Sequence, residues 1–237
     1  MLAAPMLDAL QLTGRTRTHI AQLDSPRVAL HVDAVADFLA LREAARKSGI
    51  EIAVFSGFRD FESRLALWNR KFRGERPLLD ADGLPVDHAS LDEAGIVDHI
   101  LRWTALPGAS RHHWGSELDL YDVAALPEDY RVQLVPAEYA LTGVFAHLAG
   151  WLADNAAGFG FFRPYAAFLG GVYPEPWHWS YAPVSVPALA ALTPAVIAEA
   201  VTTSDLLGKE NVLGRLVELH RTYVSAVNPP PQGVRVT

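Results

Sequence analysis

The chain has 237 residues, enough for one large domain or for one domain with a substantial addition. Half of the residues are hydrophobic and a fifth are charged, which is the balance of a globular protein with a sizeable core. A net charge of −7 and the absence of Lys/Arg runs exclude the usual nucleic-acid-binding surface, so no nucleic-acid partner is expected.

The sequence contains no cysteine, so disulfides and thiolate zinc fingers are excluded. It has no uncharged apolar run of about 18 residues, so no membrane span is expected. The first residues lack the basic and then apolar pattern of a signal peptide. The cytoplasm is expected if the chain is complete, and the periplasm if a signal has been removed.

The first part of the chain predicts two helices separated by a short strand. Apolar residues recur at helical spacing from 31 to 48, and Gly49 is suited to end this helix. Residues 51–55 form the β-branched and aromatic run that is typical of a strand. Asp60 is a suitable N-cap for the next helix, which carries its own apolar stripe.

The middle of the chain alternates irregular and regular segments. Residues 73–90 are rich in glycine, proline and charge and predict a long loop. Residues 92–103 predict a short helix, and residues 116–121 predict a strand. An apolar stripe predicts a helix over 139–155, and the glycines, prolines and aromatic residues of 158–181 predict short strands and turns.

The composition changes near residue 185. Residues 187–201 and 205–227 predict two amphipathic helices, and the proline-rich tail that follows cannot continue a helix. We therefore expect an α+β domain over residues 1–182 and a helical C-terminal extension over residues 183–237.

The residues that carry chemistry gather in two short segments. One is residues 110–120 (SRHHWGSELDL), and the other is residues 174–179 (PEPWHW). Two histidines and one carboxylate are a common ligand set for a catalytic Zn²⁺, with a fourth position left for water. A second carboxylate near that water can act as general base and then as general acid.

The spacing within the first segment requires a bend. His112 and Asp119 are seven residues apart, which on one helix is roughly 10 Å along the axis and too far to share one ion. On one flat strand the two side chains would point to opposite faces. Gly115 is the residue at which a bend costs least, so we expect the chain to turn there.

The second segment has a different geometry. Prolines on both sides of Glu175 exclude a regular helix around it. Residues 177–181 alternate between aromatic and polar side chains, so His178 and Ser180 are expected to share the face that looks into a cleft. Glu175 lies just upstream on a turn, within reach of a water at the metal.

These segments fit the patterns S-x-H-x-x-G-x-x-x-D and E-x-x-H-W, and residues 56–59 (SGFR) fit S-G-[YF]-R between a strand and a helix. Over roughly residues 30–182 the three ordered elements resemble the VanY-type D-alanyl-D-alanine carboxypeptidases, within the wider group of lysostaphin-type and hedgehog-like zinc domains. The resemblance implies an α+β fold in which a small antiparallel sheet with flanking helices forms a zinc cleft.

The resemblance also implies residue roles. His112, Asp119 and His178 are expected to bind Zn²⁺, and Glu175 is expected to be the base that activates water. The adjacent His113 is an alternative to His112 as the ligand, although the motif favours His112.

Three further residues are expected to contact the substrate. Arg59 would stabilise the oxyanion or bind a carboxylate, and Ser110 would hydrogen-bond the substrate near the scissile bond. Glu117 departs from the family pattern, which usually has a small residue, often alanine, at this position. Because it shares a strand face with Asp119, we expect it to face the cleft, where it would repel a substrate carboxylate or favour an amine.

The sequence thus predicts a zinc-dependent peptidase, a D,D- or L,D-carboxypeptidase that acts through a metal-activated water. Its expected substrates are peptidoglycan-type cell-wall peptides that contain D-amino acids. One alternative is a zinc-dependent peptidoglycan endopeptidase, and another is a non-catalytic, zinc-stabilised binding domain. The presence of Glu175 and Arg59 argues against the binding domain, because a structural zinc site needs no general base.

Overall fold

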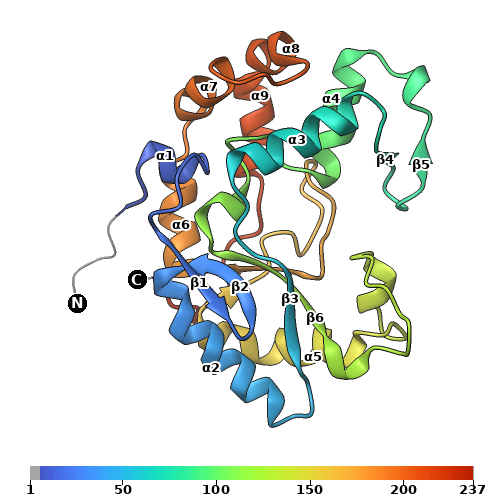
Figure 1. The fold of residues 1–237 in the computed structure, drawn as a ribbon. Helices are drawn as coiled ribbons and strands as arrows, with labels where there is room; N and C mark the ends of the chain where they lie inside the picture. The colour runs from blue at the N-terminus through green and yellow to red at the C-terminus, as the bar shows by residue number, and fades with distance from the viewer. Residues whose placement is uncertain (1–5, 237) are drawn as a thin grey trace.

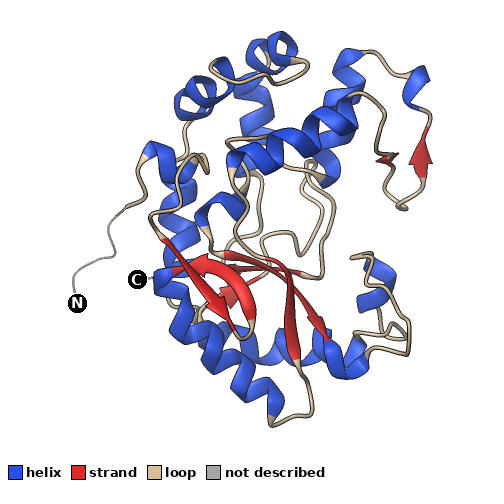
Figure 2. Ribbon diagram, viewed as in Figure 1, coloured by secondary structure: helices blue, strands red, loops and turns tan. Residues whose placement is uncertain are grey.

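The computed structural model describes residues 6–236, in which a small sheet lies between two groups of helices (Figure 1). Helices α2 (Val35–Arg46) and α5 (Ala146–Asn155) lie along one side of the sheet. Helices α3 (Phe61–Phe72) and α4 (Glu93–Trp103) lie on the other side, together with most of the C-terminal helices. Figure 2 shows the strands between these groups. The predicted α+β class with C-terminal helices is confirmed.

The other regular elements are short. The remaining α-helices are α1 (Ala9–Leu12), α6 (Ala182–Ala191), α7 (Pro194–Thr202), α8 (Lys209–Gly214) and α9 (Leu216–Leu219). The strands are β1 (Ile20–Asp24), β2 (Arg27–His31), β3 (Ile52–Ser56), β4 (Leu78–Leu79), β5 (Pro85–Val86), β6 (Glu117–Asp122), β7 (Phe161–Phe162) and β8 (His178–Tyr181). Strands β1 and β2 pair with each other, as do β4 and β5, and the other four strands form one sheet.

The four-stranded sheet is antiparallel throughout, in the order β3-β6-β8-β7. Its central pairing places Asp119 opposite His178 and Glu117 opposite Ser180. Opposed residues and residues two apart share one face of a sheet, so these four side chains lie together. Leu118, between the two carboxylates, points to the other face and is buried in the hydrophobic core.

The bend expected at Gly115 is confirmed. A 3-10 turn, Arg111–Trp114, ends at this glycine, whose φ angle of 67° is left-handed. A Cβ atom here would lie 2.4 Å from Cδ1 of Ile20 and 2.7 Å from the backbone N of His31. Only glycine meets both constraints, so the chain can turn here and enter strand β6.

Three predicted helix boundaries are confirmed by their caps, whereas the helix expected to begin at residue 31 begins at Val35, because His31 ends strand β2. Asp60 accepts a hydrogen bond from the backbone N of Ser63 (2.8 Å) at the start of α3. Asp92 does the same with the N of Gly95 (2.8 Å) at the start of α4. Gly49 follows α2 in a left-handed conformation, with φ 78°. These caps satisfy backbone groups that have no partner inside the helix.

Two predictions for the middle of the chain need correction. The loop expected over residues 73–90 contains the β4–β5 hairpin, in whose turn Asp80 accepts from the backbone N of Leu84 (2.9 Å). The helix expected to begin at residue 139 begins at Ala146. Residues 140–145 form turns instead, in which the backbone N of Phe145 donates to the carbonyl of Glu138 (2.7 Å) and that of Gly143 to the carbonyl of Ala140 (2.8 Å).

The prediction of two long C-terminal helices is wrong in extent. Residues 182–225 form four α-helices and a π-helical segment, His220–Ser225. The break between α6 and α7 occurs at Thr193, whose side chain caps α7, and at Pro194, which has no N–H to continue α6. These helices pack on the rest of the chain: Nε1 of Trp68 in α3 donates to the carbonyl of Leu207 (3.0 Å).

Their buried apolar side chains belong to the same hydrophobic cluster as those of the sheet and of α3. A shared core does not separate the C-terminal helices from the rest of the chain, so the expected division into residues 1–182 and 183–237 remains a prediction. No single helix within residues 6–236 is both long and apolar enough to cross a membrane. Helices α6 and α7 reach that length only as a pair with a 78° bend between them.

The turn at Gly115 generates a stability prediction. We expect Gly115→Ala to lower the free energy of unfolding by about 3 kcal/mol, because the new Cβ is strained and meets backbone. Gly150→Ala is the matched control, since a Cβ at this position in α5 has open space. It should raise stability by about 0.5–1 kcal/mol. Urea unfolding of both variants measures the difference, and equal effects would contradict the account of the turn.

Candidate active site

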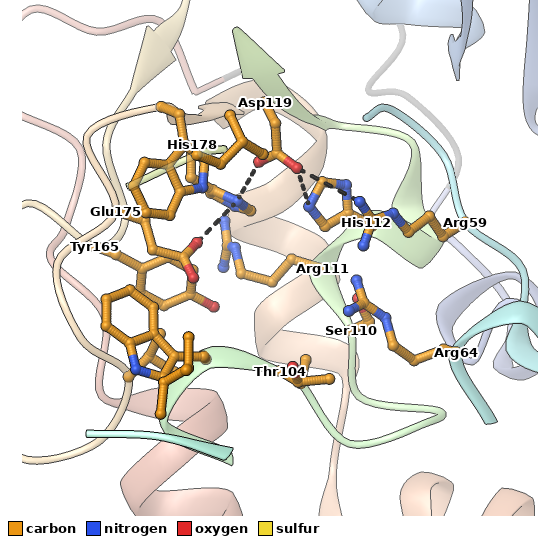
Figure 3. Close-up of a pocket in the computed structure, with 16 residues that line it drawn as sticks. Arg59, Arg64, Thr104, Ser110, Arg111, His112, Asp119, Tyr165, Glu175 and His178 are labelled. Atoms are coloured by element: carbon orange, nitrogen blue, oxygen red, sulfur yellow. Dashed lines mark hydrogen bonds and ion pairs between the residues drawn. The ribbon is translucent and has the colours of Figure 1, made fainter. Parts of the chain in front are cut away.

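A cavity of about 220 Å³ opens beside the end of the β6–β8 pair (Figure 3). Six of the seven site residues expected from the sequence line it: Arg59, Ser110, His112, Asp119, Glu175 and His178. They come from the segment after β3, the turn before β6, strand β6 itself and the approach to β8. The fold therefore brings together all three sequence motifs in one place.

His112, Asp119 and His178 form a buried cluster whose donor atoms all lie within 4.8 Å of one another. Nε2 of His112 is 3.5 Å from Oδ2 of Asp119, and Nδ1 of His178 is 3.1 Å from Oδ1. The two imidazole rings meet edge to face at 87°. One carboxylate thus lies between two imidazole nitrogens.

The other nitrogen of each ring is already occupied. Nδ1 of His112 donates to the carbonyl of Gly57 (2.7 Å), which can only accept, so its Nε2 presents a lone pair to the cluster. Nε2 of His178 bonds to Oε2 of Glu117 (2.8 Å), which leaves Nδ1 facing Asp119. Metal-binding histidines are held in this way, with the distal nitrogen fixed by an oxygen acceptor.

The surroundings set opposite charge preferences for the two rings. Burial, with the positive charges of His178, Arg59 and Arg64, lowers the pKa of His112 well below its usual range, so this ring is neutral. Burial also disfavours a charged His178, but its hydrogen bonds to Asp119 and Glu117 outweigh that effect and raise its pKa to about 10. A cation that binds at Nδ1 therefore displaces a proton.

The donor set fits a zinc ion. Ligand atoms at 2.0–2.2 Å from a tetrahedral Zn²⁺ are about 3.3–3.6 Å apart. Each histidine nitrogen lies at a similar distance from one oxygen of Asp119: 3.5 Å from Oδ2 for His112 and 3.1 Å from Oδ1 for His178. Two imidazole nitrogens and a carboxylate oxygen are ligands that zinc accepts, and this set leaves one position open. His112, Asp119 and His178 form the candidate metal site.

Glu175 lies beside this cluster. Its Oε2 is 3.4 Å from Nδ1 of His178, and its backbone is held by a hydrogen bond from its N to the carbonyl of Tyr165 (3.0 Å). Burial and the nearby Asp119 raise the pKa of Glu175 to about 7, against the opposing effect of His178. A carboxyl group with such a pKa can both take up and release a proton near neutral pH.

Arg59 reaches the cluster from the opposite side. Its NH2 group lies 3.8 Å from Oδ2 of Asp119, and its side chain is one-third exposed. Asp119 is its ion-pair partner within the described residues, so it does not form the surface pair with Asp60 or Glu62 that its sequence neighbours offer. Its backbone N donates to the carbonyl of His112 (3.1 Å), which ties the arginine to the ligand turn.

His113, the alternative ligand, is fully buried outside the cluster. Its Nδ1 donates to the carbonyl of Arg59 (2.7 Å), and its Nε2 accepts from the backbone N of Gly108 (3.1 Å). Both ring nitrogens are therefore used in holding the backbone. The geometry favours His112 as the ligand.

Glu117 does not face the cavity, contrary to the expectation from its position. It lies on the same sheet face as Asp119, but its side chain has no exposed surface and lies beneath His178. Its carboxylate is enclosed by Arg111 and Ser180, which hydrogen-bond to it. Although burial raises it, Arg111 and His178 lower the pKa of Glu117 to about 2. A direct contact with substrate is therefore excluded in this conformation.

Sequence reasoning missed two arginines that line the cavity. Arg64 and Arg111 are 5% and 3% exposed, so both guanidinium groups are removed from bulk water. Arg64 could have been found, because it falls on the apolar face of α3, between Phe61 and Trp68. A charged residue on such a face is buried and needs a function or a partner.

Ser110 lines the cavity as expected, and its Oγ is buried with no hydrogen-bond partner among residues 6–236. Nε of Arg64 is likewise buried and without a partner in this part of the chain. Thr104 lies nearby on the same wall (Figure 3), and its hydroxyl accepts from Nζ of Lys71 (2.7 Å). One end of the cavity therefore has donors and positive charge but no carboxylate.

Comparison with known proteins agrees with these features. Residues 27–184 match the VanY family, described as D-alanyl-D-alanine carboxypeptidase. One protein of Haemophilus influenzae is 34% identical over 121 residues, which are 50% of this chain and 92% of that protein. A second protein of this organism is 40% identical over 98 residues, which are 40% of this chain and 67% of that one. Both are described as uncharacterized.

Two solved structures are also similar. One is VanYB in complex with D-alanine-D-alanine, at 22% identity and a TM-score of 0.48, with 78% of this chain and 89% of that chain covered. The other is the LD-carboxypeptidase LdcB, at 23% identity and a TM-score of 0.43, with coverage of 75% and 76%. On the match of residues 27–184, the chain belongs to the VanY family of D-alanyl-D-alanine carboxypeptidases.

Proposed function

We propose that this protein is a zinc-dependent carboxypeptidase that removes the C-terminal residue from peptidoglycan-type peptides, as a D,D- or L,D-carboxypeptidase. One observation carries the proposal. The same cavity holds the His112, Asp119 and His178 cluster and, on another wall, the buried cation Arg64, which has no carboxylate within ion-pairing distance among the described residues. Such a cavity suits a peptide that ends in a free carboxylate.

His112, Asp119 and His178 would hold the zinc ion. When bound, zinc supplies Lewis acidity, which polarises the scissile carbonyl and makes water acidic enough to lose a proton near neutral pH. The protein supplies the anchoring of the two rings by Gly57 and Glu117 and a buried site in which charges interact strongly.

Glu175 is the proposed base. Its Oε2 takes a proton from the attacking water, whose oxygen forms a bond to the peptide carbonyl carbon. As the carbon–nitrogen bond breaks, the same carboxyl group gives that proton to the leaving amine. The position of Oε2 at 3.4 Å from Nδ1 of His178 supports this role, because the base must lie next to the ligand sphere without being part of it.

Arg59 is the proposed stabiliser of negative charge on the carbonyl oxygen. Its guanidinium is partly exposed to the cavity and lies on the opposite side of Asp119 from Glu175 (Figure 3). A planar cation placed where charge develops lowers the barrier without having to reorganise.

Arg64 and Ser110 are the proposed partners of the substrate's terminal carboxylate. Both have buried polar atoms without a hydrogen-bond partner in the described residues, and a carboxylate would satisfy both. Burial, followed by the neighbouring Arg59, lowers the pKa of Arg64, so an incoming anion would relieve an unfavourable charge. This favours a carboxypeptidase over an endopeptidase, whose substrate brings no carboxylate to this end of the cavity.

A peptide panel tests the proposed reaction directly. We expect zinc-loaded protein to remove one residue from peptidoglycan stem peptides with a free terminal D-alanine, and to leave the C-terminal amides intact. Mass spectrometry of paired free-acid and amide peptides, ending in D-Ala-D-Ala or in a single D-Ala, separates D,D- from L,D-activity. Equal cleavage of amides would identify an endopeptidase. Binding of wall fragments without cleavage would identify a binding domain.

Two substitutions separate metal binding from proton transfer. Glu175→Ala should abolish hydrolysis, by at least about 10²-fold, yet retain one zinc per chain. Asp119→Ala should lose both zinc and activity, because the central ligand is removed. The exposed His147→Ala serves as the control and should change neither. Elemental analysis and peptide cleavage give the two readouts, and full activity of Glu175→Ala would refute the base assignment.

The carboxylate partner has its own test. Arg64→Met keeps the length and burial of the side chain but removes its charge, and it should reduce kcat/KM for free-acid peptides by about 10²-fold. Arg70→Met, an exposed position on the same helix, should leave kcat/KM within about twofold. Unchanged discrimination between acid and amide peptides in Arg64→Met would contradict the role of Arg64.

A further inference from the structure

Glu117 makes the most densely bonded side-chain cluster next to the candidate metal site. Its Oε2 accepts from Nε2 of His178 (2.8 Å). Its Oε1 accepts from NH2 of Arg111 (3.2 Å), Oγ of Ser116 (2.9 Å) and Oγ of Ser180 (2.7 Å). Four donors thus converge on one carboxylate that has no exposed surface.

This arrangement controls which nitrogen of His178 faces the cavity. A carboxylate can only accept, so the nitrogen next to Glu117 must carry a proton. Nδ1 is then left toward Asp119 and Glu175, at 3.1 Å and 3.4 Å. Without an acceptor at this position, only the contacts of Nδ1 with Asp119 and Glu175 would orient the ring, and a proton on Nε2 would lose its hydrogen bond.

The neighbours of Glu117 hold the carboxylate itself in place. Arg111 is 3% exposed, lies 4.9 Å from the centre of the Trp114 ring and shares its NH2 group between Glu117 and Ser180. Ser180, opposite Glu117 in the β6–β8 pair, is fully buried. The acceptor is therefore fixed by the strand register and by a buried ion pair, and it cannot move away from His178 without leaving Arg111 uncompensated.

We propose that Glu117 is a positioning residue for the metal site, which acts through His178 and is itself held by Arg111 and Ser180. The proposal rests on the proposed zinc site. Glu117 fixes the ring of His178 with Nδ1 toward Asp119 and, as a negative acceptor, increases the electron density that this nitrogen offers to a cation. A purely structural ion pair with Arg111 would instead affect folding and leave zinc affinity unchanged.

Glu117→Gln tests the proposal, because it keeps the shape of the side chain and removes the charge. We expect zinc affinity, measured by competition with a chromophoric chelator, to fall by about 10- to 100-fold. We also expect the Nε2 proton resonance of His178 to be downfield and slow to exchange in the wild type, and to shift upfield or exchange faster in the variant. This resonance is followed in both metal-free and zinc-loaded protein.

Glu138→Gln is the matched control. Glu138 is a second buried glutamate, 4% exposed, that accepts hydrogen bonds from Tyr130, Gln133 and Val135 and does not line the cavity. Its substitution should lower stability to a similar extent but keep zinc affinity within about twofold. If Glu117→Gln fails to fold, Ser180→Ala decides the question, because it removes one donor to Glu117 and leaves every charge in place. It should weaken zinc binding by about two- to tenfold.

Wild-type zinc affinity together with a wild-type Nε2 resonance in Glu117→Gln, or in Ser180→Ala where that variant has to decide, would overturn the proposal. Failure of the proposed function has a different signature, since the wild-type protein would then bind no zinc, or would bind zinc without removing a C-terminal residue. In that case the Nε2 resonance in metal-free protein still shows whether Glu117 holds His178, and an unchanged resonance would refute the positioning role.

Discussion

The pairing of β6 with β8 is the constraint on which the site depends. It sets Asp119 opposite His178 and Glu117 opposite Ser180 on one sheet face, so a ligand carboxylate and a supporting carboxylate alternate beside the same imidazole. A register shift of one residue would turn these side chains to the other face. The left-handed turn at Gly115 adds the third ligand to this pair, because it brings His112 back toward the strand that follows.

A second constraint is the balance of buried charge. Three carboxylates and three guanidinium groups lie in or directly beneath one small cavity, and the carboxylates are all near a histidine or an arginine. Such charges are costly to bury unless each has a partner. Arg64 is the exception, since no carboxylate of the described residues pairs with it. A buried guanidinium without a carboxylate partner is suited to a ligand that brings one, which connects the electrostatics of the cavity to the proposed substrate.

The sequence predicted the fold class and the convergence of the motifs because both follow from local rules. Two-residue alternation placed Asp119 and His178 on strand faces, and the seven-residue spacing required the bend that the structure contains. The complete burial of Glu117 was not predictable from the sequence. Alternation along a strand predicts which face a side chain lies on, but not which other side chain covers it. Arg111 is that side chain, through a tertiary contact. The predicted boundaries of the C-terminal helices were wrong for a different reason. The apolar pattern continues past Thr193 and Pro194, although these two residues end one helix and begin the next.

The central claim is that one zinc ion binds between His112, Asp119 and His178. A crystal structure of zinc-loaded protein, with anomalous data collected on both sides of the zinc absorption edge, tests it most directly. The account predicts a single strong anomalous peak about 2.0–2.2 Å from Nε2 of His112, Nδ1 of His178 and an Oδ atom of Asp119, with Glu175 outside the coordination sphere. A peak that is absent from this site, or that is bound by Glu117 or by Nε2 of His178, would contradict it.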